Sequence, residues 1–168
     1  MCVAHETGKR RSTREFLQIL VAQTPKIQVL LDVGAQMLDL QNHDLARAWL
    51  DISPYTSAAI YFNEDDELMV CTRDGSTQLL RSSPFEQQLD RCVIYLDDAH
   101  TRGTDIKFPS GFRAAVTLGP KVTKDRLAQG MYTLPFLSTV SLVVSHRLHA
   151  DAEARPRSFG HVFRTPRN

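Results

Sequence analysis

Short runs of branched and aromatic residues along this chain are separated by stretches with the apolar spacing of helices. The runs predict strands at residues 27–33, 57–62, 67–72, 77–80, 92–97 and 113–118. The helical spacing predicts helices that begin after Ser12 and that cover residues 43–50, 84–90 and 122–129. Strands alternate with helices, and one antiparallel meander is inserted. The pattern therefore predicts an α/β fold with a partial three-layer sheet.

Three local signals predict where elements begin or turn. Ser12 and Glu15 have the spacing of a capping box at a helix start. Asn42 is expected to cap the helix over 43–50. Asp74-Gly75 between two apolar runs predicts a tight hairpin.

The organisation predicted along the chain has three parts. Residues 1–14 are expected to be a flexible N-terminus and residues 15–129 to be the α/β domain. Residues 130–168 are expected to be a disordered tail, because their late part is rich in arginine and histidine and has little apolar periodicity.

Composition limits the classes of function. The 168 residues are 42% apolar, which is enough for the core of one domain. No apolar run reaches the roughly 20 residues that span a bilayer, and no signal peptide is recognisable at the start. The cysteines, Cys2, Cys71 and Cys92, are far apart and form no CxxC pair, so we expect no metal site, no cofactor and a reducing intracellular location, cytoplasmic or nuclear. A net charge of +1 without a dense basic face argues against nucleic-acid binding.

The residues most suggestive of chemistry follow the predicted strand over 92–97. Open α/β sheets bind ligands beyond the carboxyl ends of their strands. We therefore expect a functional edge beyond the end of this strand, formed by Asp97, Asp98, His100, Arg102 and Asp105. Asp32, at the end of the neighbouring strand, is expected to belong to the same edge.

This segment resembles a known family. Residues 27–36, 46–50, 83–85, 92–105, 113–120 and 123–127 are similar to very large fungal proteins with paired domains of unknown function, catalogued as ubiquitinyl hydrolases. The likeness covers roughly residues 15–129 and implies that the chain is a fragment of such a protein, with ubiquitin or its conjugates and the remainder of the parent chain as partners. The implied activity is thiol-dependent cleavage of ubiquitin conjugates.

Within that resemblance the candidate catalytic residues are His100, Cys92 and Asp98, with Asp97 as another acid able to orient the histidine. A strand from Cys92 to Asp97 would separate its ends by about 16 Å, so Cys92 and His100 are not expected to touch. We therefore expect the isolated chain to be inactive, with the nucleophile elsewhere in the parent protein.

Two departures from the family pattern stand out. The family reads Asp-Glu-Ala-His where this chain has Asp97-Asp98-Ala99-His100, and a basic segment that follows Gln129 in the family is missing. Codons for Gly130-Met131-Tyr132 can contain GTATGT, a common fungal intron donor, so we hypothesise that residues 131–168 are intron read-through or a shifted frame. A coding exon without a donor in the genomic sequence would refute this.

Two other readings remain open. Residues 96–100 resemble the magnesium-binding acidic motif of superfamily 2 helicases, and residues 101–107 resemble the nucleotide-sensing loop of their second lobe. This resemblance implies that the partial sheet is an incomplete RecA-like lobe. No G-x-x-x-x-G-K-[ST] loop is present, so an active ATPase is not expected. The other reading is a degenerate or non-catalytic α/β module, in which Trp49 is a core residue and the acidic run 63–67 is a solvated loop.

Overall fold

The structure is a computed structural model that describes residues 5–6, 12–33, 35–101, 106, 108–118 and 139–144. Arg102, Asp105, Cys2 and the helix predicted over residues 122–129 lie outside these described residues.

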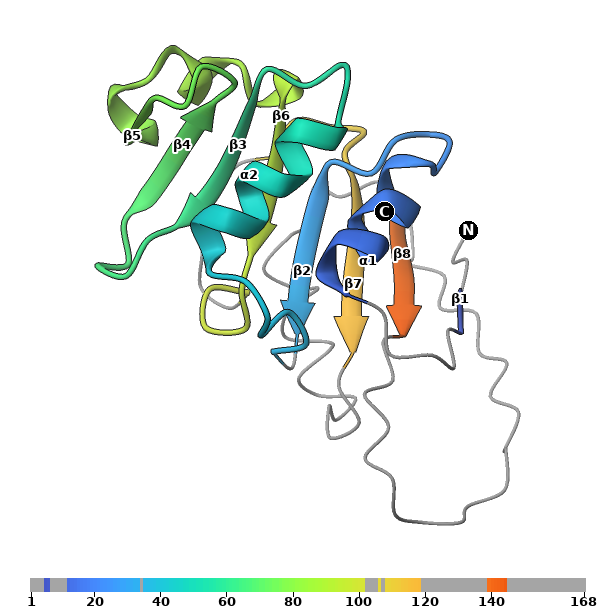
Figure 1. The fold of residues 1–168 in the computed structure, drawn as a ribbon. Coiled ribbons are helices and arrows are strands. Elements are labelled where there is room, and N and C mark those ends of the chain that lie inside the picture. The colour runs from blue at the N-terminus through green and yellow to red at the C-terminus, as the bar shows by residue number, and fades with distance from the viewer. Residues whose placement is uncertain are drawn as a thin grey trace, which may run out of the picture.

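One mixed sheet of eight strands organises the described chain (Figure 1). Its spatial order is β1-β8-β7-β2-β6-β3-β4-β5, and only β4 runs opposite to its neighbours. The strands are β1 (His5–Glu6), β2 (Val29–Val33), β3 (Ala58–Phe62), β4 (Leu68–Thr72), β5 (Thr77–Leu79), β6 (Cys92–Leu96), β7 (Arg113–Leu118) and β8 (Thr139–Val144). The α/β class predicted from the sequence is confirmed, as is the meander β3-β4-β5.

The centre of the sheet is β2, between β6 and β7. Val29 is in register with Ile94 on one side and with Ala114 on the other. All five residues of β2 and of β6 are buried, as expected for parallel strands covered on both faces. Because β2, β3, β6 and β7 are parallel, their carboxyl ends meet at one border, which we call the carboxyl edge.

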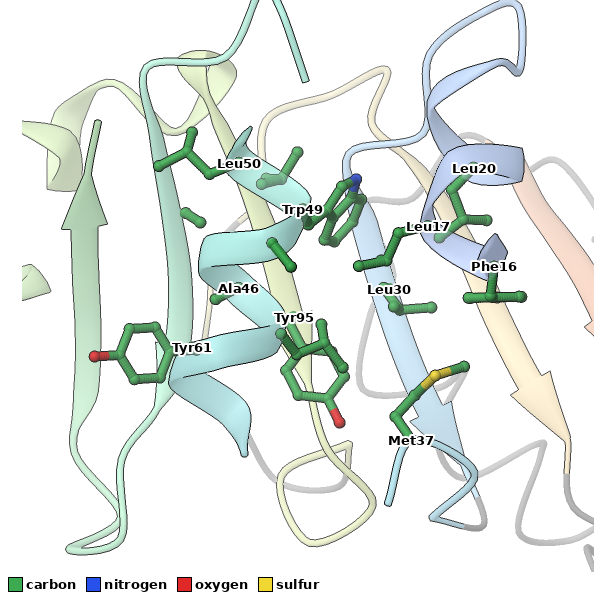
Figure 2. Packing of buried hydrophobic residues seen from close by; sticks show 14 of the residues in the cluster. Phe16, Leu17, Leu20, Leu30, Met37, Ala46, Trp49, Leu50, Tyr61 and Tyr95 are labelled. Atoms are coloured by element: carbon green, nitrogen blue, oxygen red, sulfur yellow. The ribbon is translucent and has the colours of Figure 1, made fainter. Parts of the chain in front are cut away.

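Two α-helices, α1 (Thr13–Val21) and α2 (Asn42–Ile52), cover the same face of this sheet (Figure 1). Figure 2 shows Leu17 of α1 and Trp49 of α2 directed at each other over Leu30 of β2. All three side chains are almost fully buried. The prediction that Trp49 is a core residue is confirmed.

Of the two predicted helix caps, the one of α1 is present and the one of α2 is not. Ser12 and Glu15 form the predicted capping box: the Ser12 hydroxyl accepts from Glu15 N, and the Glu15 carboxylate accepts from Ser12 N. The prediction for Asn42 is wrong, since Gln41 occupies the N-cap and Asn42 is the first helical residue. The Asn42 amide is instead used in a tertiary contact, described below.

The opposite face, called here the second face, has a core of its own. Val29, Leu31, Ile60, Ile94 and Val116 are buried there. Three 3-10 helices and a loop that includes Phe108 and Phe112 contribute to that core; the helices are η1 (Leu80–Ser82), η2 (Pro84–Gln87) and η3 (Leu89–Arg91). Among the described residues both α-helices lie on the other face, and 3-10 helices and a loop cover this one, so the predicted three-layer arrangement is only partly present there.

Three predictions about which segments form helices or strands need correction. The helix predicted over 84–90 is split into η2 and η3, because the backbone of Gln88 leaves the helical conformation, with φ of −129° and ψ of 42°. Residues 139–144 form β8, in register with β7 from Thr139 opposite Arg113. The predicted disorder of 130–168 is therefore wrong for these six residues, whose β-branched run suits a strand. Likewise His5–Glu6, within the predicted flexible N-terminus, form β1 beside β8.

Candidate functional site

A histidine held between two carboxylates is the main chemical feature of the carboxyl edge. His100 Nδ1 lies 2.7 Å from Asp97 Oδ1, and His100 Nε2 lies 3.0 Å from Asp66 Oδ1. A carboxylate accepts hydrogen bonds, so both contacts are hydrogen bonds only when both ring nitrogens carry a proton. His100 thus bridges the loop after β6 and the β3–β4 turn.

The turn after β6 explains the position of His100. The Asp97 carbonyl accepts from His100 N at 3.1 Å and from Thr101 N at 3.0 Å, and Asp97 Oδ1 also accepts from His100 N at 3.0 Å. The Thr101 hydroxyl donates to the Asp98 carbonyl at 3.0 Å. Aspartate commonly stabilises turns through such local bonds. The same carboxylate thus shapes the turn and orients the imidazole.

Residues from β3 and α2 complete the surroundings of the histidine. The Phe62 ring stacks on the His100 ring, with centroids 3.9 Å apart and planes at 4°. The Asn42 amide donates to the Phe62 carbonyl at 3.0 Å and to Asp97 Oδ2. The His100 side chain is 16% exposed, whereas Asp66 is 84% exposed. The His100 ring is therefore held by Asp97 and by the stacked Phe62, and it also contacts Asp66, an acid that faces solvent.

Asp32 lies on the neighbouring strand β2 but is occupied by the protein itself. Its Oδ1 accepts from Gln36 N at 2.8 Å and from the Thr117 hydroxyl, and its Oδ2 accepts from Met37 N at 2.9 Å. The residue is 2% exposed. This carboxylate joins β2, the loop that follows it and β7, which is a structural role.

Asp32 and Asp97 also change the pKa of Tyr95, near the end of β6. Burial raises the pKa of the Tyr95 phenol, and the negative charges of Asp32 and then Asp97 raise that pKa further. The phenol therefore stays protonated beside the two carboxylates.

Cys92 does not join His100. Cys92 begins β6 and His100 follows its end, so the length of the strand lies between them. Cys92 is 1% exposed and belongs to the core of the second face. Burial and then the charge of Asp90 raise the pKa of its thiol to about 12, and its Sγ lies 3.5 Å from the Gln88 carbonyl. Burial also raises the pKa of the Cys71 thiol. Neither thiol has the lowered pKa of a nucleophile.

The structure thus brings Asp97 and His100 together and places Asp98 beside them in the same turn. Cys92 instead lies in the core of the second face, and Asp32 binds the loop after β2 and Thr117 of β7. Sequence reasoning missed Asn42, Phe62 and Asp66 as parts of the site. Asp66 belongs to the acidic run interpreted as a solvated loop, and only the pairing of β3 with β6 brings that loop to His100. The position of Asn42 at the start of a predicted helix could be read from the sequence, but it suggested a helix cap and not a contact with Asp97.

Among the described residues, no group of three or more His, Cys, Asp and Glu side chains is arranged to hold a metal ion. No described helix combines the length and the apolar character needed to cross a membrane. Fold and site together define an α/β protein with an acid–histidine pair at the carboxyl edge of its sheet. No protein-family model, no curated protein and no solved structure matches this chain.

Proposed function

We propose that this domain is a binding module of a ubiquitinyl-hydrolase-like protein, which holds ubiquitin or its conjugates at the carboxyl edge and has no peptidase activity of its own. The observation that carries the proposal is the separation of the two halves of a thiol site. The acid–histidine pair is at one end of β6, and the buried thiol of Cys92 is at the other.

Chemical reasoning supports the inactive reading for the described residues. A cysteine nucleophile needs a base within about 3 Å and a thiolate that forms near neutral pH. The Cys92 thiol, with its pKa near 12, satisfies neither condition. Asp97 orients the His100 imidazole as the acid of a triad orients its base, so a nucleophile from the remainder of the parent chain would complete the site after Nε2 leaves Asp66.

The first test is labelling of the full chain with an electrophilic ubiquitin probe, alongside Cys2→Ala, Cys71→Ala and Cys92→Ala variants. We expect no labelling of the folded chain. Labelling that disappears only in Cys92→Ala would establish a thiol site within β6 and overturn the proposal.

The binding half of the proposal has its own test. Unlabelled ubiquitin is added to the ¹⁵N-labelled chain, and amide signals are followed by NMR. We expect shifts concentrated at Asn42, Phe62 and His100, and their loss in His100→Ala. His43→Ala is the matched control, because His43 is on α2, contacts Asp44 and is not part of the acid–histidine pair. Absence of shifts in the wild-type chain would refute ubiquitin binding.

A second candidate is a degenerate helicase-like or NTPase-like lobe with no activity of its own. It is favoured by one observation: Asp32 and Asp97 lie at the carboxyl ends of adjacent parallel strands, where such folds gather acids for Mg²⁺. This candidate predicts weak binding of Mg²⁺–nucleotide that disappears in Asp97→Asn. Calorimetry that detects no nucleotide binding to the wild-type chain would eliminate it.

A further inference from the structure

A cavity of about 680 Å³ opens on the second face beside the outer strands of the sheet. It lies where β4 begins. Leu68, the first residue of β4, pairs with β3 but not with β5, because β5 ends opposite Met69. η1 and η2 then turn back across the sheet and form the other wall. Its volume is within the range of about 300–1,000 Å³ that is typical of ligand sites.

The floor of the cavity is apolar. Leu68, Leu80, Leu89 and Ile106 line it, and all four pack against the core of the second face. Leu80 is buried, and the other three are partly buried. The floor therefore offers a surface for aliphatic side chains that is backed by a rigid core.

The walls carry an excess of negative charge. Asp66, Glu67 and Glu86 contribute three carboxylates, against one guanidinium from Arg81. In the part of the chain that the structure describes, no ion pair joins Arg81 to these acids. Such walls repel phosphates and other anions and attract cations. An apolar floor under acidic walls suits a ligand that is cationic and aliphatic at once.

We propose that this cavity binds an extended peptide segment in which leucine alternates with arginine or lysine. In an extended chain successive side chains point to opposite sides. Leucines can therefore enter the aliphatic floor, while the intervening cations reach the acids on the walls. Pockets that accept alternate side chains are a common source of specificity in the recognition of extended peptides.

The cavity and the acid–histidine pair share one residue. Asp66 lines the cavity and also contacts His100 Nε2 at 3.0 Å. A peptide cation that binds Asp66 competes with His100 for the same carboxylate. Occupation of the cavity therefore changes the environment of the imidazole, which gives a direct spectroscopic readout. The inference does not depend on ubiquitin binding.

The test uses the full chain and two synthetic peptides of equal length, one alternating leucine with arginine and one alternating leucine with glutamate. Binding is measured by fluorescence anisotropy, and the His100 ring signals are followed by NMR. We expect only the basic peptide to bind and to shift the His100 signals. Equal binding of the two peptides, or no binding of the basic one, would overturn the proposal.

Two variants locate the site. Glu86→Gln is expected to weaken binding of the basic peptide by about three- to fivefold, the effect of one partly exposed ion pair. Glu64→Gln is the matched control, because Glu64 is an exposed acid of the β3–β4 turn that does not line the cavity. Equal weakening by both variants would show non-specific charge attraction and refute the site. Peptide binding without ubiquitin binding would leave this inference standing and remove only the proposed function.

Discussion

The Asp32 carboxylate provides the sharpest test of how the carboxyl edge is held together. In Asp32→Asn, the amide oxygen can replace Oδ1 and keep the bonds from Gln36 N and the Thr117 hydroxyl. The amide nitrogen then replaces Oδ2 and faces Met37 N, which is also a donor. One charge-assisted bond is lost, and a buried N–H group is left without its acceptor.

The magnitude follows from these contacts. A hydrogen bond to a charged group contributes about 1.5–3 kcal/mol, and a buried unsatisfied donor costs about 1–3 kcal/mol. Because the two terms overlap, we expect Asp32→Asn to lower the free energy of unfolding by about 2–4 kcal/mol. That is a large part of the roughly 5–15 kcal/mol typical of a domain.

Thr117→Val removes the remaining side-chain donor at nearly constant volume, and we expect it to destabilise by about 1–2 kcal/mol. Both substitutions act on the same carboxylate, so the double variant should lose less than the two single losses added together, with a coupling of at least about 0.5 kcal/mol.

Urea denaturation, followed by Trp49 fluorescence, measures the free energies of unfolding of the two single variants and the double variant. The values can be compared if the dependence of the free energy on urea concentration has the same slope in all of them. Asp65→Asn, an exposed acid of the β3–β4 turn, is the control and should stay within about 0.5 kcal/mol of the wild type. If Asp32→Asn falls in the same narrow range, or if the double variant is strictly additive, the structural role assigned to Asp32 is wrong.

Three further predictions concern the helix cap, the core and the buried thiol. Ser12→Ala removes the capping box of α1 and should destabilise the protein by about 1 kcal/mol in the same assay, while an unchanged value would refute the cap. Leu17→Ala leaves a cavity under α1 and should cost about 2–5 kcal/mol; a loss below 1 kcal/mol would contradict the packing in Figure 2. Cys92 should resist alkylation at pH 8 until the chain is unfolded, and ready alkylation of the folded chain would contradict its burial. Since its folded pKa of about 12 lies above that of an unfolded thiol, its contribution to stability should be intact below about pH 8.5 and lost as the pH rises toward 12, a loss absent in Cys92→Ala.

Several features of the fold could be predicted from the sequence because they depend on neighbours in the chain. The strands over 92–96 and 113–118 follow from dense branched residues. The hairpin at Asp74-Gly75 follows from the need for a residue that tolerates positive φ, and Gly75 has φ of +89°. The capping box at Ser12 requires only four consecutive residues. The prediction of a buried Cys92 far from His100 likewise needed only the length of one strand.

Other features were decided by tertiary structure alone. Asn42 has a side chain suited to capping, yet its amide binds Asp97 because α2 starts beside the ends of β3 and β6. Asp66 became a partner of His100, 34 residues away in the chain, because β6 inserts next to β3. Asp32 was expected at the functional edge, but the N–H groups of the following loop occupy its carboxylate. Sequence patterns record local conformational preference and burial, whereas the partners of a polar group depend on which strands become neighbours.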